Sequence, residues 1–157
     1  MLGAFAVGKT SLVQQYVNSI FSEKYHTTIG VKIDQKMLEL PGKKVNLILW
    51  DIHGEDEFQK VKSSYLTGAS GYFLVIDGTR HYTIETARKL NEMAKETVGD
   101  KPFIVMINKY DLKDEWEITK EDIDEMKSFG WHVKLTSAKD DIGVDQSFLN
   151  LAKKMIE

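Results

Sequence analysis

The chain has 157 residues and a formal net charge of −3, which is enough material for one domain with a single buried core. A composition of 42% hydrophobic and 29% charged residues excludes a disordered tail and a membrane span, and the weak acidic balance gives no electrostatic reason to bind nucleic acid. The absence of cysteine excludes disulfides, cysteine zinc sites and thiol nucleophiles. Because no signal-peptide pattern opens the chain, we expect one globular, cytoplasmic domain over residues 1–157.

Strand and helix patterns alternate along the chain. In order, the sequence predicts a helix over 9–19, an edge strand over 29–40, a strand over 45–50, a short helical segment over 56–65, a strand over 72–76, a helix over 84–98, a strand over 103–107, a helix over 120–129, a strand over 131–135 and a helix over 144–156. Pro41-Gly42 predicts a hairpin turn, which makes the second and third segments antiparallel. The alternation predicts an α/β fold: a P-loop, doubly wound, mostly parallel sheet with helices on both faces.

Three of the apolar runs end directly on a polar residue, at Asp51, Asp77 and Asn108. Ligands of doubly wound sheets bind beyond the carboxyl ends of the strands, so these positions mark the site. Only Met1 and Leu2 precede Gly3, where this fold normally has a central strand of about five residues. We therefore expect the first central strand to be largely missing from this sequence, with the natural chain starting upstream.

A phosphate-binding pattern opens the first helix. The residues Gly3-Ala4-Phe5-Ala6-Val7-Gly8-Lys9-Thr10, followed by Ser11, match G-x-x-x-x-G-K-[ST]. Glycines let backbone N–H groups point inward, the helix N-terminus adds positive potential, and Lys9 supplies a charge to the outer phosphates, while Thr10 offers a hydroxyl to Mg²⁺. The alternative is a glycine loop that only caps a helix. The pattern alone does not distinguish ATP from GTP.

The choice of base is predicted from two later strand ends. In the segment Asn108-Lys109-Tyr110-Asp111, the Asp111 carboxylate can accept hydrogen bonds from the ring N–H and the exocyclic amine of guanine, which adenine cannot offer. Taken alone, Asp111 could equally cap a helix and Lys109 could be a surface charge. The next strand ends at Thr136-Ser137-Ala138-Lys139, where the Ala138 N–H could meet the guanine carbonyl.

The segment between these motifs contains Asp51 and Gly54. Asp51 supplies a carboxylate for water-mediated contact with Mg²⁺, and the Gly54 N–H can reach a terminal phosphate. A D-x-x-G segment by itself is a common turn. Its order and spacing relative to the other motifs favour the nucleotide-sensing interpretation.

With these motifs in this order, the chain resembles the Ras superfamily of small GTPases, and Rab-like members in particular through residues 25–30 and Trp50-Asp51. The resemblance implies that Thr28 binds Mg²⁺ only in the GTP state, that Phe21 packs against the base, and that Tyr25 closes over the phosphates. It also implies two switch loops, at residues 21–30 and 54–65, through which effector and regulator proteins bind. The catalytic set implied by this reading is Lys9, Thr28, Gly54 and Glu55.

The sequence departs from the family pattern at several positions. Glu55 stands where the family usually has the glutamine that orients the attacking water, and a carboxylate there adds negative charge near the phosphates. Phe5 and Ala6 replace residues that are usually glycine or similarly small, so an inserted arginine finger is not expected to fit. The chain has no cysteine for a lipid anchor.

The prediction is a guanine-nucleotide-binding molecular switch that holds GTP or GDP with Mg²⁺ and hydrolyses GTP slowly. One alternative is a non-hydrolysing, GTP-bound interaction module, in which Phe5 and Glu55 have replaced the catalytic arrangement. A third possibility, a P-loop kinase or ATPase, conflicts with Asp111 and with residues 136–139, because neither serves adenine recognition.

Overall fold

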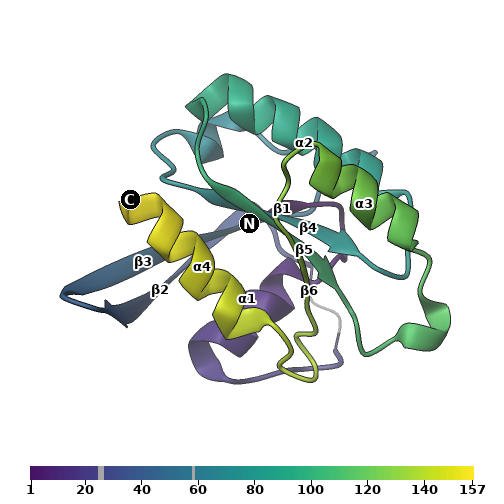
Figure 1. The fold of residues 1–157 in the computed structure, drawn as a ribbon, viewed down its shortest axis with the longest axis horizontal. Helices are drawn as coiled ribbons and strands as arrows, with labels where there is room; N and C mark the ends of the chain where they lie inside the picture. Colours follow the sequence, from purple (N-terminus) through teal and green to yellow (C-terminus); the bar gives the residue numbers. More distant parts are fainter. Residues whose placement is uncertain (25–26, 58) are drawn as a thin grey trace.

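The computed structural model describes residues 1–24, 27–57 and 59–157, and their strands form two sheets. The central sheet has four parallel strands in the order β1 (Leu2–Gly3), β4 (Tyr72–Asp77), β5 (Phe103–Asn108) and β6 (Val133–Leu135). Beside it, β2 (Val31–Leu40) and β3 (Lys43–Ile52) form an antiparallel hairpin that extends to one side of the molecule (Figure 1). The mostly parallel α/β architecture is confirmed.

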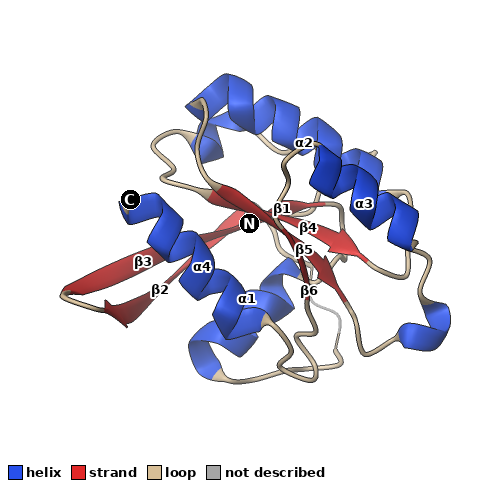
Figure 2. Ribbon diagram, viewed as in Figure 1, coloured by secondary structure: helices blue, strands red, loops and turns tan. Residues whose placement is uncertain are grey.

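Helices cover both faces of the central sheet, as Figure 2 shows. The pair α1 (Lys9–Asn18) and α4 (Val144–Ile156) lies on one face, and the pair α2 (Thr83–Val98) and α3 (Lys120–Ser128) lies on the other. Alternate residues of β4 divide between the two cores: Phe73 and Val75 belong to the cluster with α1 and α4, whereas Leu74 and Ile76 pack with α2. Period-two alternation therefore explains why β4 is buried throughout.

The hairpin belongs to a separate two-stranded sheet, although a single sheet was predicted. Residue pairing runs from Val31 opposite Ile52 to Leu40 opposite Lys43, so the turn falls at the predicted Pro41-Gly42. β1 is two residues long and lies parallel to β4, with Leu2 opposite Leu74. None of the helices in the described part of the chain has the length and apolar character needed to cross a membrane.

The predicted helical segment over 56–65 is wrong for the residues that the structure describes. Its regular part is a short 3₁₀ helix, η1 (Ser63–Leu66). Side chains bind the backbone here instead: the Gln59 N–H donates to Asp56 Oδ1 at 2.7 Å, and the Val61 N–H donates to Glu55 Oε1 at 3.2 Å. Such local bonds compete with the helical ladder. A second 3₁₀ helix, η2 (Lys113–Glu115), follows β5, and the other predicted elements differ from the observed ones by at most two residues at either end.

Candidate functional site

A cavity of about 810 Å³ opens beyond the carboxyl ends of the parallel strands, within the size range of small-molecule sites. Predicted site residues in its lining are Phe5, Ala6, Gly8, Lys9, Thr10, Ser11, Phe21, Thr28, Gly54, Asn108, Lys109, Asp111, Ala138 and Lys139. Six others, Gly3, Ala4, Val7, Asp51, Glu55 and Ser137, lie outside the lining as the described residues form it. Tyr25 lies outside the described residues.

The phosphate loop (residues 3–10) is fitted closely to the strand ends. Gly8 has φ of +101°, and a Cβ at this position would lie 2.3 Å from Asn108 Nδ2, so only glycine fits. Asn108 Nδ2 donates to the carbonyl of Val7 at 3.1 Å, and Thr136 Oγ1 donates to Asn108 Oδ1 at 3.2 Å. The loop is therefore anchored to β5 and to the end of β6 through buried side chains.

Lys9 is a buried cation at the start of α1. Its side-chain ammonium donates to the carbonyls of Gly3 and Ala4 at 3.2 and 3.1 Å, which places it under the curled loop. Burial lowers the pKa of Lys9 to about 8, against the opposing attraction of Asp51. Burying a cation at the positive end of a helix costs free energy. An anion beside the cation offsets this cost, and a phosphate is such an anion.

Two hydroxyls and one carboxylate converge beside Lys9. The Thr10 hydroxyl donates to Asp51 Oδ2 at 2.7 Å and lies 2.7 Å from the Thr28 hydroxyl. Asp51 Oδ1 is buried without a hydrogen-bond partner among the described residues, and burial raises the pKa of Asp51 despite the Thr10 hydrogen bond. Oxygen ligands of this kind suit Mg²⁺, and a cation or its water would satisfy the unpaired oxygen.

The opposite end of the cavity holds the predicted base-reading groups. Ser137 Oγ donates to Asp111 Oδ1 at 2.7 Å, which fixes the orientation of the carboxylate. Gln15 Nε2, from α1, donates to the Ala138 carbonyl at 2.8 Å and so holds the backbone of that loop. Lys139 pairs with Glu23 at 3.0 Å, and this ion pair joins the β6 end to the first switch loop. The ends of β5 and β6 thus line the same cavity as the phosphate loop.

The second switch loop lies against the phosphate loop. A Cβ on Gly54 would come within 2.4 Å of Phe5 Cα, so this close approach also requires glycine. The Phe5 N–H donates to the Glu55 carbonyl at 3.0 Å, and the Glu55 N–H donates to the Gly3 carbonyl at 3.1 Å. The Glu55 carboxylate accepts from Val61 within its own loop. Glu55 is thus tied to the phosphate loop by its backbone and to the second switch loop by its side chain.

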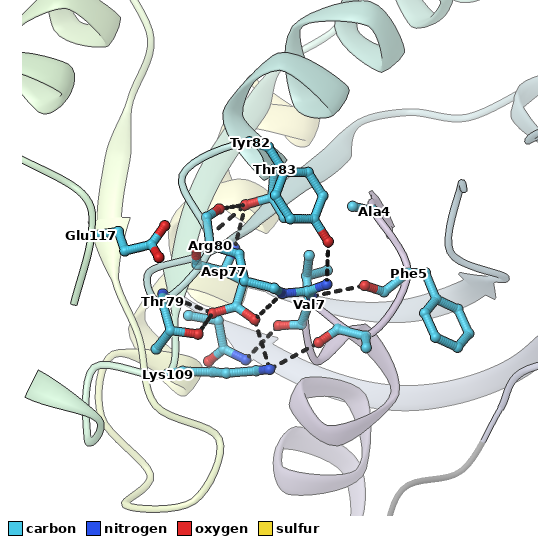
Figure 3. Close-up of polar contacts among 12 residues, drawn as sticks. Ala4, Phe5, Val7, Asp77, Thr79, Arg80, Tyr82, Thr83, Lys109 and Glu117 are labelled. Atoms are coloured by element: carbon cyan, nitrogen blue, oxygen red, sulfur yellow. Dashed lines mark hydrogen bonds and ion pairs between the residues drawn. The ribbon is translucent and has the colours of Figure 1, made fainter. Parts of the chain in front are cut away.

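The sequence marked Asp77 as a strand-end residue of the site but gave no role to Arg80; both residues lie behind the phosphate loop (Figure 3). The Asp77 side chain is fully buried; its Oδ2 accepts from Arg80 Nε at 2.8 Å and from Lys109 Nζ at 2.7 Å, and its Oδ1 accepts from Thr79. Burial acts to raise the pKa of Asp77, but the hydrogen bonds from Lys109, Thr79 and Arg80 hold it below the usual value. The position of Asp77 at the end of an apolar run is the signal by which the sequence marked it.

Comparison with known proteins agrees with this geometry. A family model described as "Ras family" matches residues 1–157. Ras-related protein Rab-32C of Dictyostelium discoideum is 36% identical over 162 residues, covering 100% of this chain and 72% of that protein. Human Ras-related protein Rab-12 is 31% identical, with 100% of this chain and 66% of the relative covered, and Ras-related protein Rab-21 of Geodia cydonium is 33% identical, with 100% and 69% covered. This chain belongs to the Ras family and is a Rab-like small GTPase, a GTP-binding switch.

Proposed function

We propose that this protein alternates between GTP-bound and GDP-bound states with Mg²⁺ and hydrolyses GTP slowly. The observation that carries this proposal is at Glu55, which stands where the family usually has the water-orienting glutamine: its carboxylate accepts from the Val61 N–H at 3.2 Å. A side chain held by its own loop is less available to position water. Its negative charge also opposes the charge that develops on the phosphates.

The remaining site residues are proposed to bind three parts of the ligand: the phosphates, Mg²⁺ and the guanine base. Lys9 and the N–H groups of the phosphate loop would hold the outer phosphates, and Gly54 would contact the terminal one. Thr10 and Thr28 would hold Mg²⁺ through their hydroxyls and Asp51 would do so through water, and the bound ion would supply neutralisation of phosphate charge. On the base side, the residues proposed to bind guanine are Phe21, Asn108, Lys109, Asp111, Ser137, Ala138 and Lys139.

Phe5 adds a second restriction on hydrolysis. Its backbone packs against Gly54, and the residue lines the cavity beside Ala6. A phenyl ring carried at this place leaves less room above the terminal phosphate for a stabilising group supplied by a partner protein. We infer that Phe5 and Glu55 together keep turnover low, and that neither is needed for nucleotide affinity.

Single-turnover hydrolysis of bound GTP tests the proposal in wild type, Phe5→Gly, Glu55→Gln and the double variant. Glutamine keeps a carbonyl oxygen that can still accept from the Val61 N–H, so the substitution isolates the charge of the side chain. We expect the double variant to hydrolyse GTP faster than wild type, with a smaller change in GTP affinity. Glu57→Gln, an exposed acid in the same loop, is the matched control. Equal rates in wild type and the double variant would contradict the proposal.

The same two residues support one further candidate function, a GTP-bound interaction module without turnover. In that case, wild type would bind and exchange GTP normally but release no phosphate in the single-turnover assay. Turnover restored only in the double variant would assign the loss to Phe5 and Glu55. Measurable wild-type turnover would exclude this candidate and leave the slow GTPase.

Partner proteins are proposed to bind across the two switch loops and the hairpin between them. Ile33 and Trp50 are opposite each other on the hairpin, and both are exposed, as is Ile48. In the backbone, the His53 N–H donates to the Gly30 carbonyl at 2.8 Å, which connects the first switch loop to the residue that precedes the second. We expect amide hydrogen exchange to differ between the GDP state and a non-hydrolysable GTP state mainly in residues 21–30 and 54–65. Identical exchange in both states would argue against a switch at these loops.

A further inference from the structure

Two cations hold two successive carbonyls of the phosphate loop from behind. Arg80 Nη2 donates to the Phe5 carbonyl at 2.8 Å, and Lys109 Nζ donates to the Ala6 carbonyl at 2.9 Å. Both cations also bind Asp77 Oδ2, so one buried carboxylate positions the pair. In Figure 3, Arg80 reaches from Asp77 to the Phe5 carbonyl, and the Phe5 ring points away from the guanidinium.

These contacts to the carbonyls of Phe5 and Ala6 also fix the direction of the N–H groups in the same two peptide units, those of Ala6 and Val7. The described peptide bonds are trans, so the carbonyl of Phe5 and the N–H of Ala6 point in opposite directions from the same plane. With the carbonyl turned toward Arg80, the Ala6 N–H turns toward the cavity that Ala6 lines. Successive N–H groups pointing into one concavity form an anion-binding nest.

This orientation of the peptide between Phe5 and Ala6 requires a strained backbone conformation at Ala6. Ala6 has φ of +62°, a left-handed conformation that costs a residue with a Cβ about 1–2 kcal/mol. Rotation of the peptide between Phe5 and Ala6 would relieve this strain, but it would direct a carbonyl oxygen at the phosphates. A contact that holds the Phe5 carbonyl therefore opposes the loss of the nest.

Arg80 is suited to this task by its planar set of donors. Its Nε binds Asp77 at 2.8 Å, its Nη1 binds the Tyr82 hydroxyl at 2.8 Å, and its Nη2 remains for the Phe5 carbonyl. A lysine at this position would carry one point charge and could not keep the same fork-shaped arrangement. The guanidinium is thus fixed by two contacts before it touches the loop.

We propose that Arg80 is a positioning residue of the nucleotide site: it holds the peptide between Phe5 and Ala6 so that the Ala6 N–H faces the bound phosphates. It thereby lengthens the time for which GDP and GTP remain bound. This inference rests on nucleotide binding at the proposed site and does not depend on the rate of hydrolysis.

Release of a fluorescent GDP analogue from Arg80→Gln and Arg80→Lys tests the inference. We expect release from both variants to be about tenfold faster than from wild type, the scale of losing one charge-assisted hydrogen bond. Arg88→Gln is the matched control, because Arg88 lies in the helix α2 that follows Arg80 but pairs with Glu125 on the surface. Its release rate should equal that of wild type.

A second measurement separates positioning from general stability. Affinity for guanosine monophosphate, which lacks the outer phosphates, should be nearly unchanged in Arg80→Gln, while affinity for GDP should fall. An equal loss for both nucleotides would show that Arg80 only stabilises the fold, and GDP release at the wild-type rate would show that it does not position the loop. Either result overturns the inference, and neither depends on GTP turnover, which tests the proposed slow GTPase separately.

Discussion

The two ends of the cavity differ in how completely the protein satisfies its own polar groups. At the base end, Asn108, Asp111 and Ser137 are held by hydrogen bonds within the protein, at 2.7 to 3.2 Å. At the phosphate end, Asp51 has a buried oxygen without a partner among the described residues, and Lys9 has a pKa lowered to about 8 by burial. The base end is preorganised by hydrogen bonds within the protein, and we call it the template. At the phosphate end, a bound ligand would supply the missing partners of the charged groups.

The difference indicates how recognition and signalling are divided. A formed template discriminates between bases because a wrong base leaves a fixed polar group unpaired. The charged and polar groups at the phosphate end, the charge cluster, are not all paired within the protein, so their arrangement depends on the phosphates and the cation that bind there. The terminal phosphate and the contacts of Mg²⁺ differ most between nucleotide states. We infer that specificity resides at the base end and the switch at the phosphate end.

Replacing Asp111 by asparagine should break the template and produce the largest effect. Xanthine carries a carbonyl in place of guanine's exocyclic amine, so the wild-type carboxylate repels it, whereas the Asp111→Asn amide can donate to it. Asn keeps an oxygen for Ser137, so the local contact at 2.7 Å can persist. We expect a shift of at least about tenfold on each side, or about a hundredfold in the GTP-to-XTP preference, in a competition assay.

The exposed Asp114→Asn, in the neighbouring 3₁₀ helix η2, is the control for this change and should keep the wild-type preference. A folded Asp111→Asn variant that still prefers GTP as strongly as wild type would show that Asp111 does not read the base.

The stability of the nucleotide-free protein should depend on pH through Lys9. Because the folded pKa of about 8 lies below the ordinary value of 10.5, the unfolded chain binds more protons between these values, and stability rises as pH increases. From about pH 7.5 to about pH 9.5 the gain from this group should be about 2 kcal/mol in denaturant unfolding. Lys9→Met should lose this increment, and bound nucleotide should reduce it. A pH dependence that is the same in wild type and Lys9→Met would refute the assignment.

Chelation of Mg²⁺ tests the other half of the charge cluster and has the smallest expected effect. Removing the cation should accelerate release of bound GDP by about tenfold, because phosphate charge is no longer neutralised. In Asp51→Asn, release should already be fast and should respond less to chelator. If GDP release from loaded wild type is insensitive to chelator, Thr10 and Asp51 do not support a metal.

Patterns that are local in sequence were the ones that could be predicted. The glycines of the phosphate loop lie immediately before α1, and the apolar run that ends at Asn108 locates the edge of the central sheet without knowledge of the fold. Helix and strand positions followed from periodicity for the same reason. The predicted motifs at the phosphate loop, at residues 108–111 and at residues 136–139 all contribute residues to one cavity in the structure.

Features that depend on distant partners could not be predicted in this way. Arg80 follows Asp77 by three residues, but its relevance comes from Phe5, which is 75 positions away. The error over 56–65 has a different cause: the residues look helical, yet the carboxylates of Glu55 and Asp56 bind nearby backbone N–H groups. Helix propensity does not include this competition between side-chain and helical hydrogen bonds, because the competition depends on where the neighbouring loops place the chain.

The phosphate loop is closed by contacts between residues far apart in the chain, and this has a consequence for chain entropy. The side chains of Asn108 and Lys109 reach carbonyls 101 and 103 positions earlier, whereas the hairpin joins Val31 to Ile52 at its open end. By the logarithmic law of loop closure, closing this long loop costs about 1.4 kcal/mol more than closing the hairpin. A nucleotide that binds only when this loop is closed stabilises the closed form by its binding free energy, which offsets the entropy lost in closing the loop. The nucleotide therefore promotes folding of its own binding site.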